Sequence, residues 1–498
     1  MPKNLPSDWP EVVVSNTTMS ALISKAVKKD HLRKIAARLY TPNFRDEPEQ
    51  IVKRNLWTIV AGFFPAALVA DRTVFEMKPA ADGSVCLIAN QDNEILLPGV
   101  LLRPRKGKAP ITEDRPFLNG LYLSSIPRAC LENMRPTRAR GGKLPRTLTQ
   151  TELEEWLEKY LLTNGEDGIN KLRDDIKRIA PELEMENEAI EFSRMVSAFL
   201  NTHTAGSFRP VSKQAIARIK GEPYDSERIN RFMILHQALL NRAPTIRLDT
   251  AISPISQQNI SFFEAYFSNF IEGTEFEVRD AFEIVFEGTI PARRPEDAHD
   301  VVGTFQVVAN LQRGEQNPGR FESFLSLLRK QHETILKARP EKGPGAFKQQ
   351  NNRAGQSLFV SPELVKGTLQ QGFELSRSLD AGFSRAIFLM FIIAEVHPFA
   401  DGNGRMARIV MNTELLANKE QRIIIPTVYR NNYLSALKAL THNNNPEPFI
   451  RVMDYAQKWT SSIDWNDFEI IMQQLHSSNA FTDSSLAEEE GIRLRIPY

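Results

Sequence analysis

The sequence predicts two kinds of fold in one chain: an α+β N-terminal domain, then a mainly α-helical region with one β-hairpin. From about residue 15 to 148, short apolar runs alternate with Pro, Gly and basic clusters, which is typical of strands and turns. From Thr149 onward, apolar residues recur at helical spacing. A chain of 498 residues exceeds what one hydrophobic core can serve, so we expect two or three domains.

The N-terminal domain, residues 1–148, begins with a predicted helix over Met19 to Val27 and a strand pair between Asp30 and Pro42. A helix over Ile51 to Val60 and a strand over Pro65 to Val69 follow. This order resembles the winged-helix start of the AbiEi-type antitoxin regulators. The resemblance implies a domain that contacts DNA phosphates through basic side chains, and a solvated charged surface is the alternative. These side chains are Lys25, Lys28, Lys29, Arg33 and Lys34, expected on a helix, and Arg38, expected in a wing.

Residues 149–183 form a predicted helical connector, in which Thr149 or Thr151 caps a helix that opens with residues 152–157. Residues 169–179 supply a second helix. From residue 184 to 498 we expect one mainly helical region. Its predicted helices include Asn187 to Phe199, Glu227 to Leu240 and Gln257 to Ile271.

Composition limits the function of the chain. Its 62 basic and 61 acidic residues nearly cancel, so the overall charge does not indicate a nucleic-acid partner. Cys86 and Cys130 lie in apolar contexts, which argues against a disulfide framework and fits a reducing cytoplasm. The first ten residues lack the apolar stretch of a signal peptide, and the longest apolar run, Ile387 to Ala394, is too short for a bilayer. We therefore expect a cytoplasmic protein with no membrane partner.

The densest group of chemically active residues is the segment 397–408, HPFADGNGRMAR, which lies between an apolar run and a helical pattern. Gly402 and Gly404 permit backbone conformations that point N–H groups inward, and the following helix N-terminus adds free donors for an anion. Asp401 is a hard oxygen ligand of the kind that Mg²⁺ shares with substrate phosphates. A histidine such as His397 can titrate near neutrality, which suits deprotonation of a hydroxyl. The alternative is a polar loop whose histidine and aspartate only cap a helix.

The segment resembles the Fic family signature H-P-F-x-[DE]-G-N-G-R-x-x-R, with every fixed position matched. The family transfers a nucleoside monophosphate, usually AMP from ATP, to a hydroxyl side chain of a target protein. The resemblance implies that His397 is the general base and Asp401 the Mg²⁺ ligand. It also implies an anion hole for the α- and β-phosphates at Gly402, Asn403 and Gly404, phosphate support at Arg405 and a γ-phosphate contact at Arg408.

A second segment, Ser268 to Gly273, matches the Fic inhibitory pattern [ST]-x-x-x-E-[GN] and lies N-terminal to the signature. Glu272 docked against Arg408 would form a charge-assisted pair in the place of the γ-phosphate, so ATP would bind unproductively. Apolar spacing and the stop at Gly273 predict an inhibitory helix at about 257–273. An ordinary amphipathic helix with a surface glutamate is the alternative. In some relatives this glutamate also supports AMP removal, which the sequence leaves open here.

Residues 342–362 predict a β-hairpin flap, with two Gly-Pro turns and a strand over Leu358 to Val360. In the Fic family this hairpin lies over the active site and pairs with an extended target segment. Many relatives carry Arg in place of Lys348, so the register stays open, and a surface loop is the alternative. Residues 428–437 resemble the family helix that lines the base pocket, where Tyr433 would stack near adenine unless it belongs to the core. The flap residues expected beside the nucleotide are Gln356, Ser357, Leu358 and Phe359.

The sequence therefore predicts an autoinhibited protein adenylyltransferase whose Fic core spans about 310–455 and whose Ser268, Glu272 and Gly273 form the inhibitory element. ATP, Mg²⁺ and a target protein with a Ser, Thr or Tyr hydroxyl are the expected partners, and a homo-oligomer stays open. Two alternatives remain. The same site could remove AMP or transfer another nucleotide, or the chain could be a DNA-binding regulator with a nucleotide-sensing Fic domain.

Overall fold

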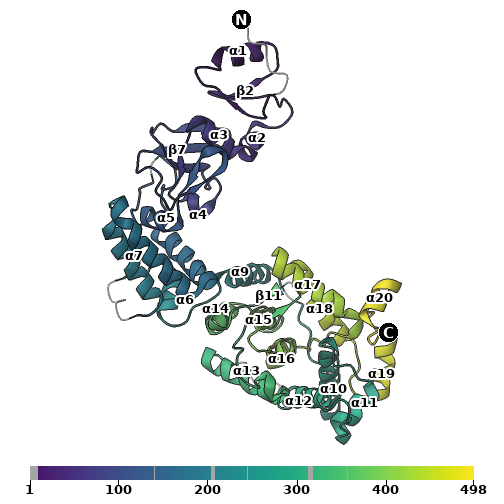
Figure 1. Ribbon diagram of the computed structural model, residues 1–498. Coiled ribbons are helices and arrows are strands. Elements are labelled where there is room, and N and C mark those ends of the chain that lie inside the picture. The colour runs from purple at the N-terminus through teal and green to yellow at the C-terminus, as the bar shows by residue number, and fades with distance from the viewer. Residues whose placement is uncertain are drawn as a thin grey trace. The chain divides into compact units, whose positions relative to one another are not determined.

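The computed structural model describes residues 9–139, 141–202, 208–243, 245–311, 318–355 and 357–497. Contacts divide the chain into two compact units, Met1–Lys220 and Gly221–Tyr498. The first unit combines helices with a mixed sheet, and the second is mainly helical with one small hairpin (Figure 1). The predicted fold class is therefore confirmed.

The first unit opens with a helix followed by a strand pair, as predicted. Helix α1 (Ser20–Lys28) precedes β2 (Arg33–Ala36) and β3 (Leu39–Thr41), and β1 (Val13–Val14) completes an antiparallel sheet in the order β1-β3-β2. The expectation that Arg33 and Lys34 lie on the helix is wrong, because α1 ends at Lys28 and the chain turns at Asp30 with a φ of 55°. Winged-helix function stays a prediction.

Two of the basic side chains of this region have structural partners. Arg33 Nε donates to the Asn43 carbonyl oxygen at 2.6 Å, and Arg38 Nε donates to the Ser15 carbonyl oxygen at 3.0 Å. The Arg38 guanidinium also lies over the Phe63 ring, 5.2 Å from its centroid. These arginines stabilise the turns around the hairpin. The lysines of α1, Lys25 and Lys28, are exposed.

A six-stranded mixed sheet in the order β6-β7-β5-β4-β9-β8 forms the centre of the first unit. Strand β5 is buried throughout, and its Val85 and Leu87 share an apolar cluster with Ile59 and Val60. The single helix predicted over 51–60 is two helices that meet at Asn55. The elements are α2 (Pro48–Arg54), α3 (Leu56–Phe63), β4 (Leu68–Val69), α4 (Thr73–Glu76), β5 (Ser84–Ile88), β6 (Ile95–Leu97), β7 (Val100–Arg105), β8 (Arg115–Pro116), β9 (Tyr122–Leu123) and α5 (Ile126–Asn133).

Helix α6 (Gln150–Leu183) begins with a capping box, in which Thr149 and Glu152 bond each other's backbone N–H groups. It is interrupted at Gly165, where φ is 69°, so it contains the two predicted helical segments. Helices α7 (Glu186–Phe199) and α8 (Lys213–Ile219) pack on α6. Residues 184–220 therefore lie with the first unit, whereas the sequence-based boundary placed them in the mainly helical region 184–498. Apolar side chains of α7, such as Phe192, share one buried cluster with α6.

The centre of the second unit is α15 (Phe383–Val396), a helix that is apolar on all sides and buried along almost its whole length. Helices α9, α14 and α16 pack around it (Figure 1). The hairpin consists of β10 (Arg353–Ala354) and β11 (Ser357–Leu358), so its second strand starts and ends earlier than predicted. The helices are α9 (Ser226–Leu240), α10 (Pro254–Ile271), α11 (Val278–Phe282), α12 (Pro295–Ala309), α13 (Phe321–Ile335), α14 (Val365–Ser376), α16 (Asn403–Ala417), α17 (Arg430–Asn443), α18 (Glu447–Thr460), α19 (Phe468–Ser477) and α20 (Ser484–Glu490).

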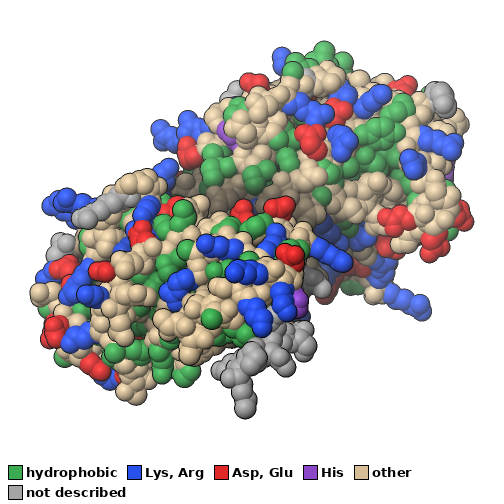
Figure 2. Space-filling model, turned by 90° about the horizontal axis from the view of Figure 1, so that it is seen from above, with side chains coloured by type: hydrophobic (Ala, Val, Ile, Leu, Met, Phe, Trp, Pro, Cys, Tyr) green, Lys and Arg blue, Asp and Glu red, His purple; other side chains and the backbone are tan. Residues whose placement is uncertain are grey.

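Helix α10 is a core element rather than a surface helix. Phe263 and Phe267 lie in an aromatic cluster that also contains Trp459 and Trp465. Across the part of the chain that the structure describes, no helix is long and apolar enough to cross a membrane. On the face that Figure 2 shows, basic, acidic and apolar side chains are interspersed, in keeping with the near-equal numbers of both charges.

Candidate active site

The loop between α15 and α16 is held at both ends by hydrogen bonds of its own residues. His397 caps α15 with a φ of 54°, and its N–H donates to the Ile393 carbonyl oxygen at 3.0 Å. Asn403 closes the other end, because its Oδ1 accepts the Phe399 N–H at 2.8 Å and its Nδ2 donates to the Phe399 carbonyl at 2.9 Å. The site is thus presented by two rigid helices rather than by a free loop.

The His397 ring is arranged as a neutral base. Nδ1 lies 3.1 Å from the Ala394 carbonyl oxygen, so we assign the proton to Nδ1, which leaves the Nε2 lone pair free. The ring stacks on Phe359, with 3.7 Å between centroids and 5° between planes. Burial, together with the charge of Lys348, lowers the pKa of His397 to about 4. At neutral pH the imidazole is uncharged and can accept a proton.

The first turn of α16 offers a cradle of backbone N–H groups to which an anion could bind. The N–H groups of Asn403, Gly404 and Arg405 are the first of the helix and have no partner within it. A Cβ added to Gly404 would lie 2.1 Å from Oε1 of Glu272, so the glutamate carboxylate lies directly against this backbone. Glycine is required here because no side chain would fit between them. The cradle is therefore covered by a negatively charged group of the same chain.

Arg408 binds the end of α10 through three contacts. Its Nη2 donates to Oε1 of Glu272 at 2.7 Å and to the Ser268 carbonyl at 2.9 Å, while its Nε donates to Ser268 Oγ at 3.0 Å. The Arg408 side chain is 5% exposed and that of Glu272 is 36% exposed. Glu272 caps α10, and Gly273 follows with a φ of 90°. Residues that lie 136 positions apart in the sequence thus meet as a close ion pair.

Arg405 points to a different partner. Its Nη1 lies 3.0 Å from Oδ2 of Asp300 and 3.3 Å from Oδ1 of Asn269. Asp300 is buried on α12 and also pairs with Arg339 at 3.0 Å. Arg405 therefore links α16 to α12 and α10, and it positions the helix that carries the cradle.

Asp401 is the carboxylate nearest to the cradle in sequence, and its Oδ1 accepts the N–H of Gly402 at 2.6 Å. Among the described residues, no group of three or more His, Cys, Asp or Glu side chains could hold a metal ion on its own. A single carboxylate beside an anion cradle fits Mg²⁺ that is shared with phosphates, because this ion is commonly held by one or two carboxylates and completed by phosphates and water. The donor set therefore fits an ion that arrives with a nucleotide.

The flap is connected to this loop through Lys348. The Lys348 N–H donates to the Pro398 carbonyl at 2.9 Å, and its Nζ donates to Asn352 Oδ1 at 2.7 Å. Burial lowers the pKa of Lys348 to about 8. Lys348 is 4% exposed, so the residue that departs from the family pattern has a structural place at the base of the flap.

The predicted nucleotide contacts of the flap and of α17 have different surroundings. Ser357 Oγ lies 2.8 Å from His442 Nε2, Leu358 is 58% exposed at the hairpin edge, and Phe359 stacks on His397. Gln356 lies outside the described residues. Tyr433 is buried, and its hydroxyl lies beside the Arg408 guanidinium rather than in an open pocket. Tyr433 therefore contributes to the surroundings of the Glu272–Arg408 pair.

Sequence reasoning missed His332 on α13, which joins the flap to the loop. Its Nδ1 accepts the N–H of Gly345 at 2.9 Å, so Nε2 donates to the Asp401 carbonyl at 3.0 Å. The ring stacks on Phe399 at 3.7 Å, and burial lowers the pKa of His332 to about 4. A histidine on the apolar stripe of an amphipathic helix was the available signal, since Phe321, Leu325, Leu328, His332 and Ile335 are all on the buried face of α13.

Part of the chain is similar to known proteins. Residues 323–415, which contain the flap, α15 and the 397–408 loop, match the model of the Fic/DOC family. A Fido domain-containing protein of Dictyostelium discoideum is 35% identical over 78 residues, which are 15% of this chain and 54% of that protein. The protein adenylyltransferase Fic of Drosophila yakuba is 35% identical over 82 residues, 16% of either chain. The protein adenylyltransferase fic-1 of Caenorhabditis briggsae is 22% identical over 275 residues, which are 54% of this chain and 52% of that one.

The chain spans about half, or less, of the length of these curated relatives. Residues 323–415 therefore form a Fic/DOC domain, and part of the chain is similar to the protein adenylyltransferases. Among solved structures, Fic-1 from Caenorhabditis elegans aligns with a TM-score of 0.37 and 18% identity, covering 66% of this chain and 93% of that one. A Fic domain containing signaling protein from Bacteroides thetaiotaomicron gives the same TM-score and identity, covering 47% and 94%.

Proposed function

We propose that this chain is an autoinhibited protein adenylyltransferase that moves AMP from Mg-ATP to a Ser, Thr or Tyr hydroxyl of a target protein. The observation that carries the proposal is the arrangement of one loop, in which a neutral His397, the Asp401 carboxylate and a free helix N-terminus lie together. The relation to protein adenylyltransferases supports this class of reaction.

In the proposed reaction, Nε2 of His397 accepts the proton of the target hydroxyl. The hydroxyl oxygen forms a bond to the α-phosphorus, and the bond from the α-phosphorus to the oxygen that bridges to the β-phosphorus breaks. AMP is then esterified to the target, and pyrophosphate leaves. The hydrogen bond from Nδ1 to the Ala394 carbonyl holds the ring in the tautomer that this step needs.

The other residues of the loop hold the phosphates. Asp401 would hold Mg²⁺, which, when bound, neutralises charge on the phosphate oxygens. The N–H groups at Asn403 and Gly404 would bind phosphate oxygens, as expected at a helix N-terminus. An extended target segment would pair along the exposed edge of β11, where Leu358 lies.

In this proposal Glu272 keeps the basal rate low by occupying the γ-phosphate position. Its carboxylate binds Arg408 and lies against Gly404, so a γ-phosphate would compete for the same groups. Like charges at one site repel, and a nucleotide with Glu272 in place would bind in a shifted, unproductive position. Release of the pair would activate transfer.

The decisive experiment measures label from α-labelled ATP on protein with Mg²⁺ present, for wild type, Glu272→Gly and Glu272→Gly with His397→Ala. We expect little label for the wild type, strong label for the single variant and none for the double variant. Absence of label from Glu272→Gly in every lysate would reject transfer and favour AMP removal or nucleotide sensing.

A further inference from the structure

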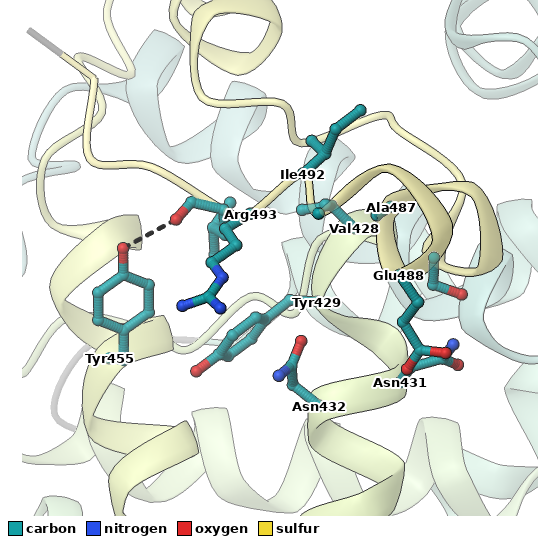
Figure 3. Close-up of a pocket in the computed structure, with 12 residues that line it drawn as sticks. Val428, Tyr429, Asn431, Asn432, Tyr455, Ala487, Glu488, Ile492 and Arg493 are labelled. Carbon is teal, nitrogen blue, oxygen red and sulfur yellow. Dashed lines mark hydrogen bonds between the residues drawn. The ribbon is translucent and has the colours of Figure 1, made fainter.

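A cavity of about 630 Å³ borders the start of α17 and contains no residue of the 397–408 loop. Its walls are formed by residues 428–432, by Tyr455 of α18, and by α20 with the segment that follows it (Figure 3). This volume lies within the usual range for small-molecule sites. The cavity is therefore large enough for a ligand separate from the proposed substrate site.

Four polar side chains line this cavity without a partner. Among the described residues, no hydrogen bond or ion pair involves the side chains of Asn431, Asn432, Glu488 or Arg493. Figure 3 shows the Arg493 guanidinium pointing toward the rings of Tyr429 and Tyr455, while Glu488 and Asn431 lie together at the other end of the cavity. One cation, one anion and two amides are thus available to a ligand.

The chemistry of these groups selects a nucleotide. An unpaired guanidinium binds phosphate oxygens in a bidentate manner, and the flat face of a tyrosine accepts a base by stacking. Asparagine amides offer both donors and acceptors, which suits the edge of a base, and a carboxylate accepts from an exocyclic amino group. With Arg493 at one end and Glu488 and Asn431 at the other, the order of groups fits a phosphate, a ring and an amino group.

The same turn that lines the cavity also holds the end of α10, next to Glu272. Arg430 Nε donates to the Ile271 carbonyl at 3.0 Å, and Ile271 is the last residue of α10 before Glu272. Tyr433, one turn further along α17, lies beside Arg408. Tyr429, Asn431 and Asn432 line the cavity, so the start of α17 borders the cavity on one side and, through Tyr433, the Glu272–Arg408 pair on the other.

We propose that this cavity is an effector site for a purine mononucleotide, and that binding there stabilises the Glu272–Arg408 pair through Arg430. Arg430 joins this turn to the end of α10, so a ligand that orders residues 428–432 restrains Ile271 and favours the paired state. The regulatory meaning of this coupling rests on the proposed function. Ligand binding and its coupling to the ion pair do not depend on that function.

Binding is tested with AMP and GMP on the full chain by titration calorimetry. Arg493→Gln should weaken binding at least tenfold, while Arg495→Gln, two residues further along the same segment, should leave it unchanged. Asn403→Ala, which removes the side chain that closes the cradle, disturbs the substrate site and should retain this binding. The proposal is overturned if neither nucleotide binds Asn403→Ala, or if Arg493→Gln binds as well as the wild type.

Coupling is tested by hydrogen exchange of the backbone around Glu272. The N–H groups of Glu272 and Gly273 donate to the carbonyls of Asn269 and Phe270, both at 3.0 Å, and these bonds report on the end of α10. Saturating AMP should slow their exchange at least threefold in the wild type. It should not do so in Arg430→Gln, which keeps the binding site, or in Arg493→Gln, which loses it.

Equal slowing in Arg430→Gln would overturn the route through Arg430, and equal slowing in Arg493→Gln would assign the effect to the substrate site. Neither readout requires transfer of AMP. A failed labelling assay with Glu272→Gly would therefore reject the proposed function and leave these two results to stand by themselves.

Discussion

Each unit buries an arginine in an ion pair, but the two pairs differ in the exposure of the acid. In the first unit, Arg128 is 1% exposed and pairs with Asp114, which is 0% exposed, at 2.6 Å. In the second unit, Arg408 is 5% exposed and pairs at 2.7 Å with Glu272, which is 36% exposed. Water can solvate the Glu272 carboxylate when its ion pair with Arg408 breaks, whereas water does not reach the buried Asp114 carboxylate. The Arg128–Asp114 pair therefore stabilises the fold, whereas the Arg408–Glu272 pair is suited to an exchange of binding partners.

The largest effect should come from breaking the pair in the first unit. Asp114→Asn leaves Arg128 with Glu132 as its remaining carboxylate, at 3.0 Å, and should lower the free energy of unfolding by about 3 kcal/mol. Denaturant unfolding with hydrogen exchange of residues 9–220 measures this loss. Asp46→Asn, in the exposed pair with Arg54, is the matched control and should change little. Equal losses in both variants would contradict the comparison.

Acid should act on the second unit by charging its buried histidines, whereas His31 in the first unit is exposed. Burial lowers the pKa of His332 from 6.5 to about 4, so between these values the unfolded chain binds more protons than the folded one. Stability is complete above pH 6.5 and is lost as the pH falls to 4, by up to about 3 kcal/mol for this group. Unfolding measured from pH 7.5 to 4.5 should show a smaller slope for His332→Gln. An unchanged slope would assign the acid sensitivity to other groups.

The same contrast between a buried and a partly exposed acid occurs within one helix. Glu264 lies on α10 and Glu272 at its end, and each pairs with a buried arginine. Glu264 is 3% exposed and lies 2.9 Å from Arg422, and burial raises its pKa. Glu272→Ala should increase AMP transfer about 10- to 100-fold, the value of one or two charge-assisted hydrogen bonds, with little loss of stability. Glu264→Ala should destabilise the unit without this activation. Activation by Glu264→Ala to the same extent would show that loosening of α10, rather than release of Arg408, controls the rate.

The smallest effect should come from the contacts of His332. The amide nitrogen of Gln can replace Nε2 and donate to the Asp401 carbonyl, and the amide oxygen of Asn can replace Nδ1 and accept from Gly345. In the Glu272→Ala background, His332→Asn should weaken Mg-ATP binding about tenfold, as for other residues that orient a metal ligand. His332→Gln should instead raise the KM for the target. Equal effects of both variants on both quantities would mean a purely structural role for His332.

The local elements of the site could be predicted because each depends on neighbouring residues. The segment 397–408 contains its glycines, its carboxylate and its histidine in one run, so a loop that enters a helix follows from turn chemistry and helical spacing. The helix that ends near Glu272 and the hairpin around Gly355 were predicted for the same reason, although the second strand lies at Ser357–Leu358. Arg33 was misplaced because a basic run shows no clear period at the end of a helix.

The sequence by itself determined the helical character of the second unit, the loop that enters α16 and, through the family pattern, the two partners of an ion pair 136 residues apart. Only the tertiary structure decided that His332 joins Gly345 to Asp401, that Arg405 meets Asp300, and that Arg430 holds Ile271. It also decided that residues 184–220 pack with the first unit. The physical reason is that periodicity and turn chemistry act over about a dozen residues, whereas these contacts depend on how separate helices pack around α15.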